Sequence, residues 1–224
     1  WPSEGYQSDG SELPDAKNED PGDEAELGKV KASNRSEGAI VKKARRYRQA
    51  KNNAQDSVDA LARFLRLLSI ARLQANAQPY SLAVHSLGGH FLQYTLEIEA
   101  AREALGSAFH IALLAPCVRA SGHRDWVEKL RPRGRVFVTY NEDDSVLFGA
   151  YIVDGNQVKL GAEPGTERVQ NGVTRYVCFS NSVVGFGGHA YFVHGKLPKK
   201  TKGFFTRIFN SQPDLKPGEH PRQV

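Results

Sequence analysis

A serine in the segment Tyr80–Gly89 has the surroundings that nucleophilic chemistry needs. The segment reads Tyr-Ser-Leu-Ala-Val-His-Ser-Leu-Gly-Gly, a short apolar run followed by Ser86 and small residues. This order predicts a strand, a sharp turn and a helix, with the Ser86 hydroxyl projecting beyond the end of the strand. The first N–H groups of a helix have no partner within it, so the N–H of Leu87 could donate to an oxyanion. The stretch therefore predicts a nucleophile beside half of an oxyanion hole.

A serine hydroxyl becomes a nucleophile when a base takes its proton and a carboxylate orients that base. Two later segments supply such groups, and each follows a predicted strand. Residues 141–147 read Asn-Glu-Asp-Asp-Ser-Val-Leu, and residues 185–192 read Gly-Phe-Gly-Gly-His-Ala-Tyr-Phe. The order along the chain is therefore serine, acid, histidine, which is one of the known orders for a catalytic triad.

Several residues compete for the two supporting roles. Asp144, Asp143 and Glu142 are all candidates for the acid, and they lie in the same turn. His189 is the favoured base because the glycines before it allow a close approach of the backbone and the aromatic residues after it can enclose the ring. His194 is its main rival.

The other histidines and the two cysteines are expected to have structural roles. His85 and His110 lie in apolar stretches and are expected to pack there, whereas His123 is expected at the surface. Cys117 and Cys178 also lie in apolar runs, which predicts buried thiols and no disulfide framework. No Cys/His spacing resembles a zinc site, and acyl transfer to serine requires neither a metal nor a cofactor, so we expect none.

Alternating strands and helices must position these groups. Apolar runs predict four strands, and helical periodicity or capping signals predict the segments between them. In chain order the expected elements are a helix over about 50–73, strand 80–85, a helix from Leu87 to about Leu105, strand 109–115, helix 125–130, strand 135–140, strand 173–179 and a helix over about 203–210. Such alternation predicts an α/β fold of three layers, α/β/α, with a mostly parallel sheet. Reactive groups gather at the carboxyl ends of the strands in such sheets.

The sequence divides into three parts by composition. Residues 1–50 are polar and are expected to form a flexible N-terminal insertion, with loop or disorder over residues 4–38. Residues 51–210 carry the predicted α/β domain, and residues 211–224, which contain three prolines, are expected to form an extended tail.

Charge and hydropathy narrow the possible partners. The formal net charge is +5, and the basic clusters at residues 42–48 and 196–202 match no nucleic-acid-binding motif, so no nucleic-acid partner is expected. No apolar run approaches the roughly 20 residues needed to cross a bilayer, so no transmembrane segment is expected. The first residues are polar and acidic rather than typical of a secretory leader, which favours a cytoplasmic location as an expectation.

The segment Val84-His85-Ser86-Leu87-Gly88-Gly89 resembles the nucleophile elbow of the α/β-hydrolase superfamily, with Val84 where a small residue is usual. Residues 140–147 and 188–192 look like the matching segments of poorly characterised bacterial esterase/lipase-like hydrolases. The similarity covers residues 1–3 and about 47–195. It implies Ser86 as nucleophile, Asp144 as acid, His189 as base and the N–H of Leu87 in the oxyanion hole.

The same resemblance implies that part of the parent fold is missing from this chain. Several strands precede the elbow strand in that fold, and one leads to the second oxyanion donor, but nothing before Tyr80 reads as such a strand. The chain contains no methionine, which also favours a fragment of a longer protein. We therefore expect the elbow strand to have an open, apolar edge.

The resemblance implies a serine hydrolase that cleaves small-molecule carboxylic esters through an acyl-enzyme intermediate. The alternative from a different class is a non-catalytic hydrolase-fold module that binds a partner, which the departure at Val84 and the missing strands favour. A third reading keeps the reactive Ser86 but makes the enzyme an acyltransferase or a peptidase.

Overall fold

The structure is a computed structural model that describes residues 29–180, 188–193, 197–216 and 219–221. The chain divides into two compact units, with the boundary between Asp56 and Ser57. The described part of the first unit is helix α1 (Lys29–Asp56). The prediction of a loop over residues 29–38 is wrong. This stretch contains the good helix formers Lys, Ala, Arg and Glu, and a polar composition alone does not prevent a helix.

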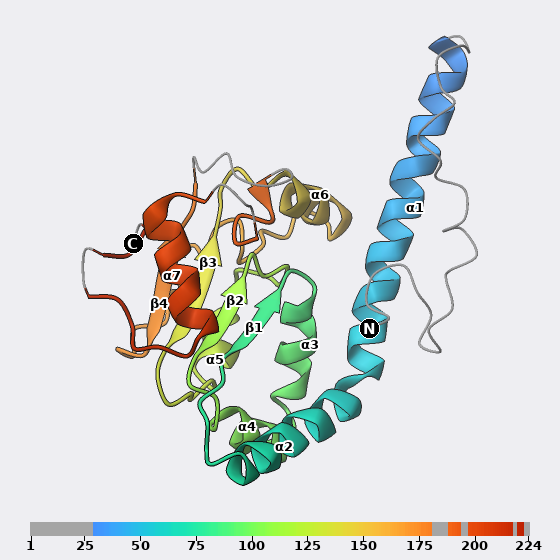
Figure 1. The fold of residues 1–224 in the computed structure, drawn as a ribbon. Coiled ribbons are helices and arrows are strands. Elements are labelled where there is room, and N and C mark those ends of the chain that lie inside the picture. Colours follow the sequence, from blue (N-terminus) through green and yellow to red (C-terminus); the bar gives the residue numbers. More distant parts are fainter. Residues whose placement is uncertain (1–28, 181–187, 194–196, 217–218, 222–224) are drawn as a thin grey trace. The chain divides into compact units, whose positions relative to one another are not determined.

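A parallel sheet of four strands forms the centre of the second unit (Figure 1). The strands are β1 (Leu82–His85), β2 (Ile111–Leu114), β3 (Val136–Tyr140) and β4 (Thr174–Cys178), in the spatial order β1-β2-β3-β4. They correspond to the four predicted strands, shortened by one or two residues at their ends. The predicted α/β class is confirmed.

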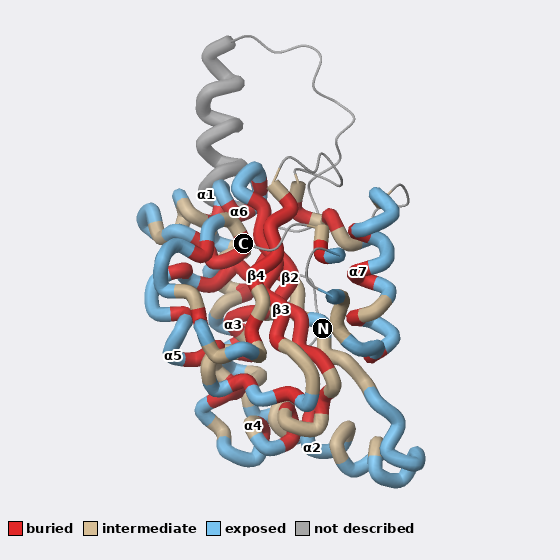
Figure 2. The backbone as a smooth tube through the Cα atoms, turned by 90° about the vertical axis from the view of Figure 1, so that its left-hand side faces the viewer, coloured by how far each residue is buried: buried red, intermediate tan, exposed pale blue. Residues whose placement is uncertain are grey.

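Helices lie on both sides of this sheet (Figure 2). They are α2 (Val58–Gln74), α3 (Gly88–Thr95), α4 (Glu99–Leu105), α5 (His123–Val127), α6 (Ser145–Val153) and α7 (Lys199–Phe209). The connections from β1 to β2 and from β2 to β3 each contain a helix, as parallel pairing requires.

The two faces of the sheet pack against different helices because side chains alternate along each strand. On one face, Ile111 and Val138 belong to a core that includes Leu65 of α2, Leu92 of α3 and Trp126 of α5. The opposite face is aromatic. Its ring contacts join Phe137 to Phe204, Phe179 to Phe205 and Phe179 to Tyr191.

The helix predicted from Leu87 to about Leu105 is two helices in the structure. The break falls between α3 and α4, where Ile98 has an extended backbone with φ −89° and ψ 115°. Leu96 at the break is fully buried, and its carbonyl, which the break removes from the helical pattern, accepts a hydrogen bond of 2.6 Å from Arg102 Nη1. Core packing has therefore overridden the helical periodicity of this segment.

Strand β1 occupies an edge of the sheet. Among the residues that the structure describes, it pairs only with β2, and its residues are half-buried or, at Ala83, exposed. The expected edge position of the elbow strand is confirmed within these ranges.

In the described ranges, none of the helices has the length and apolar character needed to span a membrane.

Candidate active site

Ser86 lies at a sharp turn directly after β1. Its φ is +51°, in the left-handed region that non-glycine residues rarely adopt. Three hydrogen bonds hold this conformation: the Ser86 N–H donates to Leu114 O at 3.0 Å, and the Ser86 carbonyl accepts from the N–H groups of Gly89 and Cys117, each at 3.0 Å. A strained residue held in this way at a strand end is typical of functional sites.

Two glycines provide space below this turn. A Cβ atom at Gly88 would lie 3.1 Å from Val84 Cγ1, and one at Gly89 would lie 3.1 Å from Val118 Cγ1. The branched side chain of Val84 is therefore accommodated because Gly88 has no side chain. The sharp turn at Ser86 therefore forms with a branched side chain at position 84.

Asp144 lies after β3 and uses both oxygens of its carboxylate. Oδ1 accepts hydrogen bonds from the N–H groups of Val146 and Leu147, at 3.0 and 2.9 Å, and so caps the N-terminus of α6. Oδ2 forms a hydrogen bond of 2.6 Å with His189 Nδ1. Asp144 is buried, whereas the competing acids Asp143 and Glu142 are exposed.

The imidazole of His189 is the partner of this carboxylate and is largely buried. Because Nδ1 is bonded to Asp144, Nε2 is the nitrogen that remains for a substrate or a nucleophile. The His85 ring lies against the His189 ring, with 4.6 Å between the centroids, and Phe192 packs against His85 at 4.8 Å. Since His85 directly precedes Ser86, this contact places the His189 ring next to the serine turn.

Burial keeps the His85 ring neutral near neutral pH. Its pKa is lowered to about 4, first by burial and then by the neighbouring His189, while the backbone of His189 and the charge of Asp144 oppose the shift. A neutral His85 ring would not repel a positive charge on the neighbouring imidazole.

The hydroxyl of Ser86 and the ring of His189 do not form a direct hydrogen bond within the described part of the chain. Catalytic hydrogen bonds are often long or misaligned in unliganded sites and tighten with substrate. The structure thus brings Asp144 and His189 together, and the contact of His189 with His85 places this pair beside the turn at Ser86.

The N–H of Leu87, the predicted oxyanion donor, lies at the start of helix α3. Leu87 is the N-cap residue of α3, and its N–H has no hydrogen-bond partner in the described ranges. The amide could therefore donate to an anion at this helix terminus.

The remaining histidines have structural partners or lie outside the described residues, as His194 does. The predicted surface position of His123 is wrong, because this side chain is fully buried between the Ala120 carbonyl, at 2.5 Å from Nδ1, and the Tyr176 hydroxyl, at 2.7 Å from Nε2. These two hydrogen bonds satisfy both ring nitrogens of His123 inside the core. His110 is packed in the interior, as expected.

Two residues that the sequence reasoning did not single out attach the histidine turn to the sheet. Asn141 Nδ2 donates to the carbonyl of Gly188 at 2.8 Å, and the buried Tyr191 hydroxyl accepts from the Ala115 N–H at 3.1 Å. Gly188 and Tyr191 flank His189 on either side. Asn141 begins the acid turn, so a polar residue directly after a buried strand was the signal available in the sequence.

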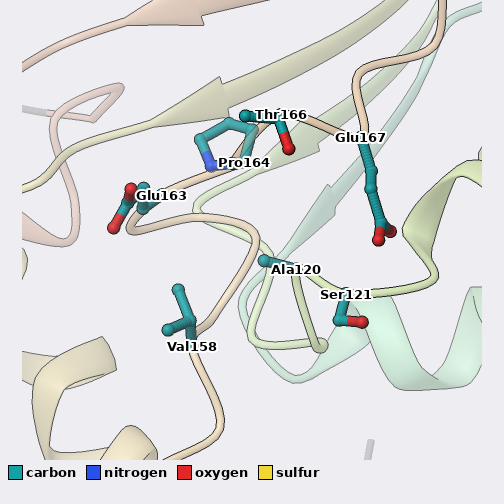
Figure 3. A pocket seen from close by; sticks show the side chains of 8 residues that line it. Ala120, Ser121, Val158, Glu163, Pro164, Thr166 and Glu167 are labelled. Carbon is teal, nitrogen blue, oxygen red and sulfur yellow. The ribbon is translucent and has the colours of Figure 1, made fainter.

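A separate pocket lies beside the loop that precedes β4 (Figure 3). Its lining includes Glu163 and Glu167, and Glu167 accepts a hydrogen bond from the Gly122 N–H at 2.8 Å. None of its lining residues belongs to the predicted triad. Within the described residues, no three His, Cys, Asp or Glu side chains are grouped to hold a metal. Cys117 and Cys178 are buried and are not joined by a disulfide.

Comparison with family models, with curated proteins and with solved structures finds no match to this chain.

Proposed function

We propose that this protein is a serine hydrolase that cleaves carboxylic esters through an acyl-serine intermediate. Ser86 is the nucleophile, His189 the general base and Asp144 the acid that orients it. The observation that carries the proposal is the 2.6 Å hydrogen bond between Asp144 and His189 beside a serine held at φ +51°.

The proposed reaction uses these groups in two steps. His189 Nε2 takes the proton of Ser86 as Oγ attacks the ester carbonyl, and the Leu87 N–H donates to the oxyanion that forms. The C–O bond to the alcohol breaks as His189 returns the proton to the leaving oxygen. A water molecule then attacks the acyl-serine with the same base, releasing the acid and restoring Ser86.

One observation favours the alternative of a non-catalytic hydrolase-fold module. The missing hydrogen bond between Ser86 and His189 within the described residues leaves the nucleophile without visible activation. In this alternative the elbow is a structural turn and the buried Asp144–His189 pair is a stabilising contact.

A serine-directed fluorophosphonate probe distinguishes the two. We expect covalent labelling at Ser86, with loss of labelling in Ser86→Ala and a loss of about 10³-fold or more in ester hydrolysis for Ser86→Ala and His189→Ala. Ser81→Ala is the matched control, because Ser81 lies on the same segment and its hydroxyl bonds to Ser211 at 2.9 Å rather than facing the site.

The proposal fails if the folded protein is not labelled, or if labelling persists in Ser86→Ala. Circular dichroism of each variant establishes that the comparison is between folded proteins. If the folded protein is not labelled, the non-catalytic alternative replaces the hydrolase proposal.

A further inference from the structure

Asn141 uses all four of its hydrogen-bonding groups to join two turns. Its backbone N–H donates to Gly161 O at 2.8 Å, and its backbone carbonyl accepts from the Asp144 N–H at 3.2 Å. Its side-chain oxygen accepts from the Asp143 N–H at 3.1 Å, and Nδ2 donates to the Gly188 carbonyl at 2.8 Å. The residue is 1% exposed.

The orientation of the Asn141 amide follows from its partners. One partner is a backbone N–H, which can only donate, and the other is a carbonyl, which can only accept. A flipped amide would oppose both, so only one orientation satisfies the site.

The histidine turn is shaped to receive this side chain. Gly188, directly before His189, has φ +73°, and a Cβ atom there would lie 2.5 Å from Asn141 Nδ2. A side chain at position 188 would therefore be strained and would also displace Asn141. The close approach allows the amide to reach the carbonyl next to the base.

We infer that Asn141 is a positioning residue that fixes His189 against Asp144. The side chain links the acid turn, three residues before Asp144, to the residue that precedes His189. Both members of the pair are thereby held in register through one rigid, planar amide. The catalytic part of this inference rests on the proposed function, whereas the geometric part does not.

Asn141 and Tyr191 hold the histidine turn in different ways. Tyr191 anchors the far side of the histidine turn to Ala115 and to the Thr139 hydroxyl, at 3.1 and 2.6 Å, and has no contact with the acid turn among the hydrogen bonds of the described residues. Asn141 is therefore the link that sets the separation of the acid and the base.

Two variants test the link. Asn141→Leu has a similar volume and removes both side-chain hydrogen bonds. Asn141→Asp keeps the acceptor for the Asp143 N–H and replaces the donor to Gly188 with a negatively charged carboxylate oxygen. The matched control is Asn171→Ala. Asn171 Oδ1 accepts from the Val173 and Thr174 N–H groups, at 3.0 and 2.9 Å, at the start of β4 and hence at the opposite end of the sheet.

The first readout is proton NMR of the low-field Nδ1–H of His189 in its hydrogen bond to Asp144. We expect this resonance to be lost or broadened in both Asn141 variants and to be unchanged in Asn171→Ala at matched thermal stability. The second readout is hydrolysis of p-nitrophenyl acetate, for which we expect kcat to fall about 10- to 100-fold with little change in KM.

The inference is overturned if the resonance is unchanged in a folded Asn141→Asp or Asn141→Leu variant, or if Asn171→Ala alters it equally. Failure of the proposed function gives a different pattern: the wild-type protein is then unlabelled by the fluorophosphonate, while the NMR comparison still decides whether Asn141 positions the pair.

Discussion

The buried polar residues around the candidate site form more hydrogen bonds than a catalytic triad alone would need. Asp144 caps a helix with one oxygen and contacts His189 with the other, so the carboxylate cannot rotate without losing a bond. Tyr191 plays a similar double role. Its hydroxyl accepts from the Ala115 N–H and bonds to Thr139, and Ala115 itself has a φ of +43°.

At this scale we predict that Tyr191→Phe destabilises the protein by about 1–3 kcal/mol, because the Ala115 N–H is left buried without a partner. Urea unfolding measures the change. The His189–Asp144 resonance should persist, since Asn141 still holds the turn.

Tyr176→Phe is the matched comparison, because the Tyr176 hydroxyl accepts from the Val169 N–H at 3.0 Å and bonds to His123 away from the site. Tyr176→Phe should lower the free energy of unfolding by a similar amount. A Tyr191→Phe protein with wild-type stability would show that the hydroxyl contributes no net stabilisation.

The elements of the fold differ in how far their sequences reveal them. The four strands could be predicted because buried parallel strands are continuous apolar runs such as residues 109–115. The serine, acid and histidine segments followed from those strand ends. Helix α6 could not be recognised by periodicity, because its sequence Ser-Val-Leu-Phe-Gly-Ala-Tyr-Ile-Val is apolar on every face.

Other features depend on contacts that a single sequence does not show. The break between α3 and α4 arises where Leu96 is buried and Arg102 reaches its carbonyl. The buried position of His123 depends on Tyr176, which lies 53 residues away in the chain. The link from Asn141 to Gly188 likewise spans 47 residues, so no local pattern could reveal it.

Helix α7 supplies aromatic side chains to one face of the sheet. Phe204 is 1% exposed and contacts Phe137 with ring centroids 5.3 Å apart, while Phe209 on the same helix is 47% exposed. We predict that Phe204→Ala lowers the free energy of unfolding by about 3–5 kcal/mol, because the lost ring leaves a cavity against the sheet.

Phe209→Ala should cost less than about 1 kcal/mol and controls for the change in helix propensity. Thermal or urea unfolding of both variants makes the comparison. Equal losses in the two would mean that α7 is not docked on the sheet through Phe204.

For the whole molecule, three histidines in the described ranges contribute to the loss of stability in acid. Burial is the main cause that lowers the pKa of His85, His110 and His123. The unfolded chain therefore binds protons at these sites more readily than the folded one. Stability is fully present above the ordinary histidine pKa of about 6.5 and is lost as the pH falls towards the lowered values.

We predict that the free energy of unfolding decreases from pH 6.5 towards pH 4. For His85, whose pKa is lowered to about 4, the loss is about 2 kcal/mol once partial solvent screening is allowed for. His85→Phe should flatten this part of the curve, since it retains a ring against His189 without a titrating group. A stability that stays constant or rises over this interval contradicts the prediction.

The order of the strands in space, β1-β2-β3-β4, is also their order along the chain. Among the described strands, each one after β1 pairs with the strand that precedes it in the chain. Loop closure between consecutive strands costs less entropy than the pairing of strands distant in sequence. During synthesis the sheet can grow by one strand at a time, and the Asp144–His189 contact closes only after β4 has been added.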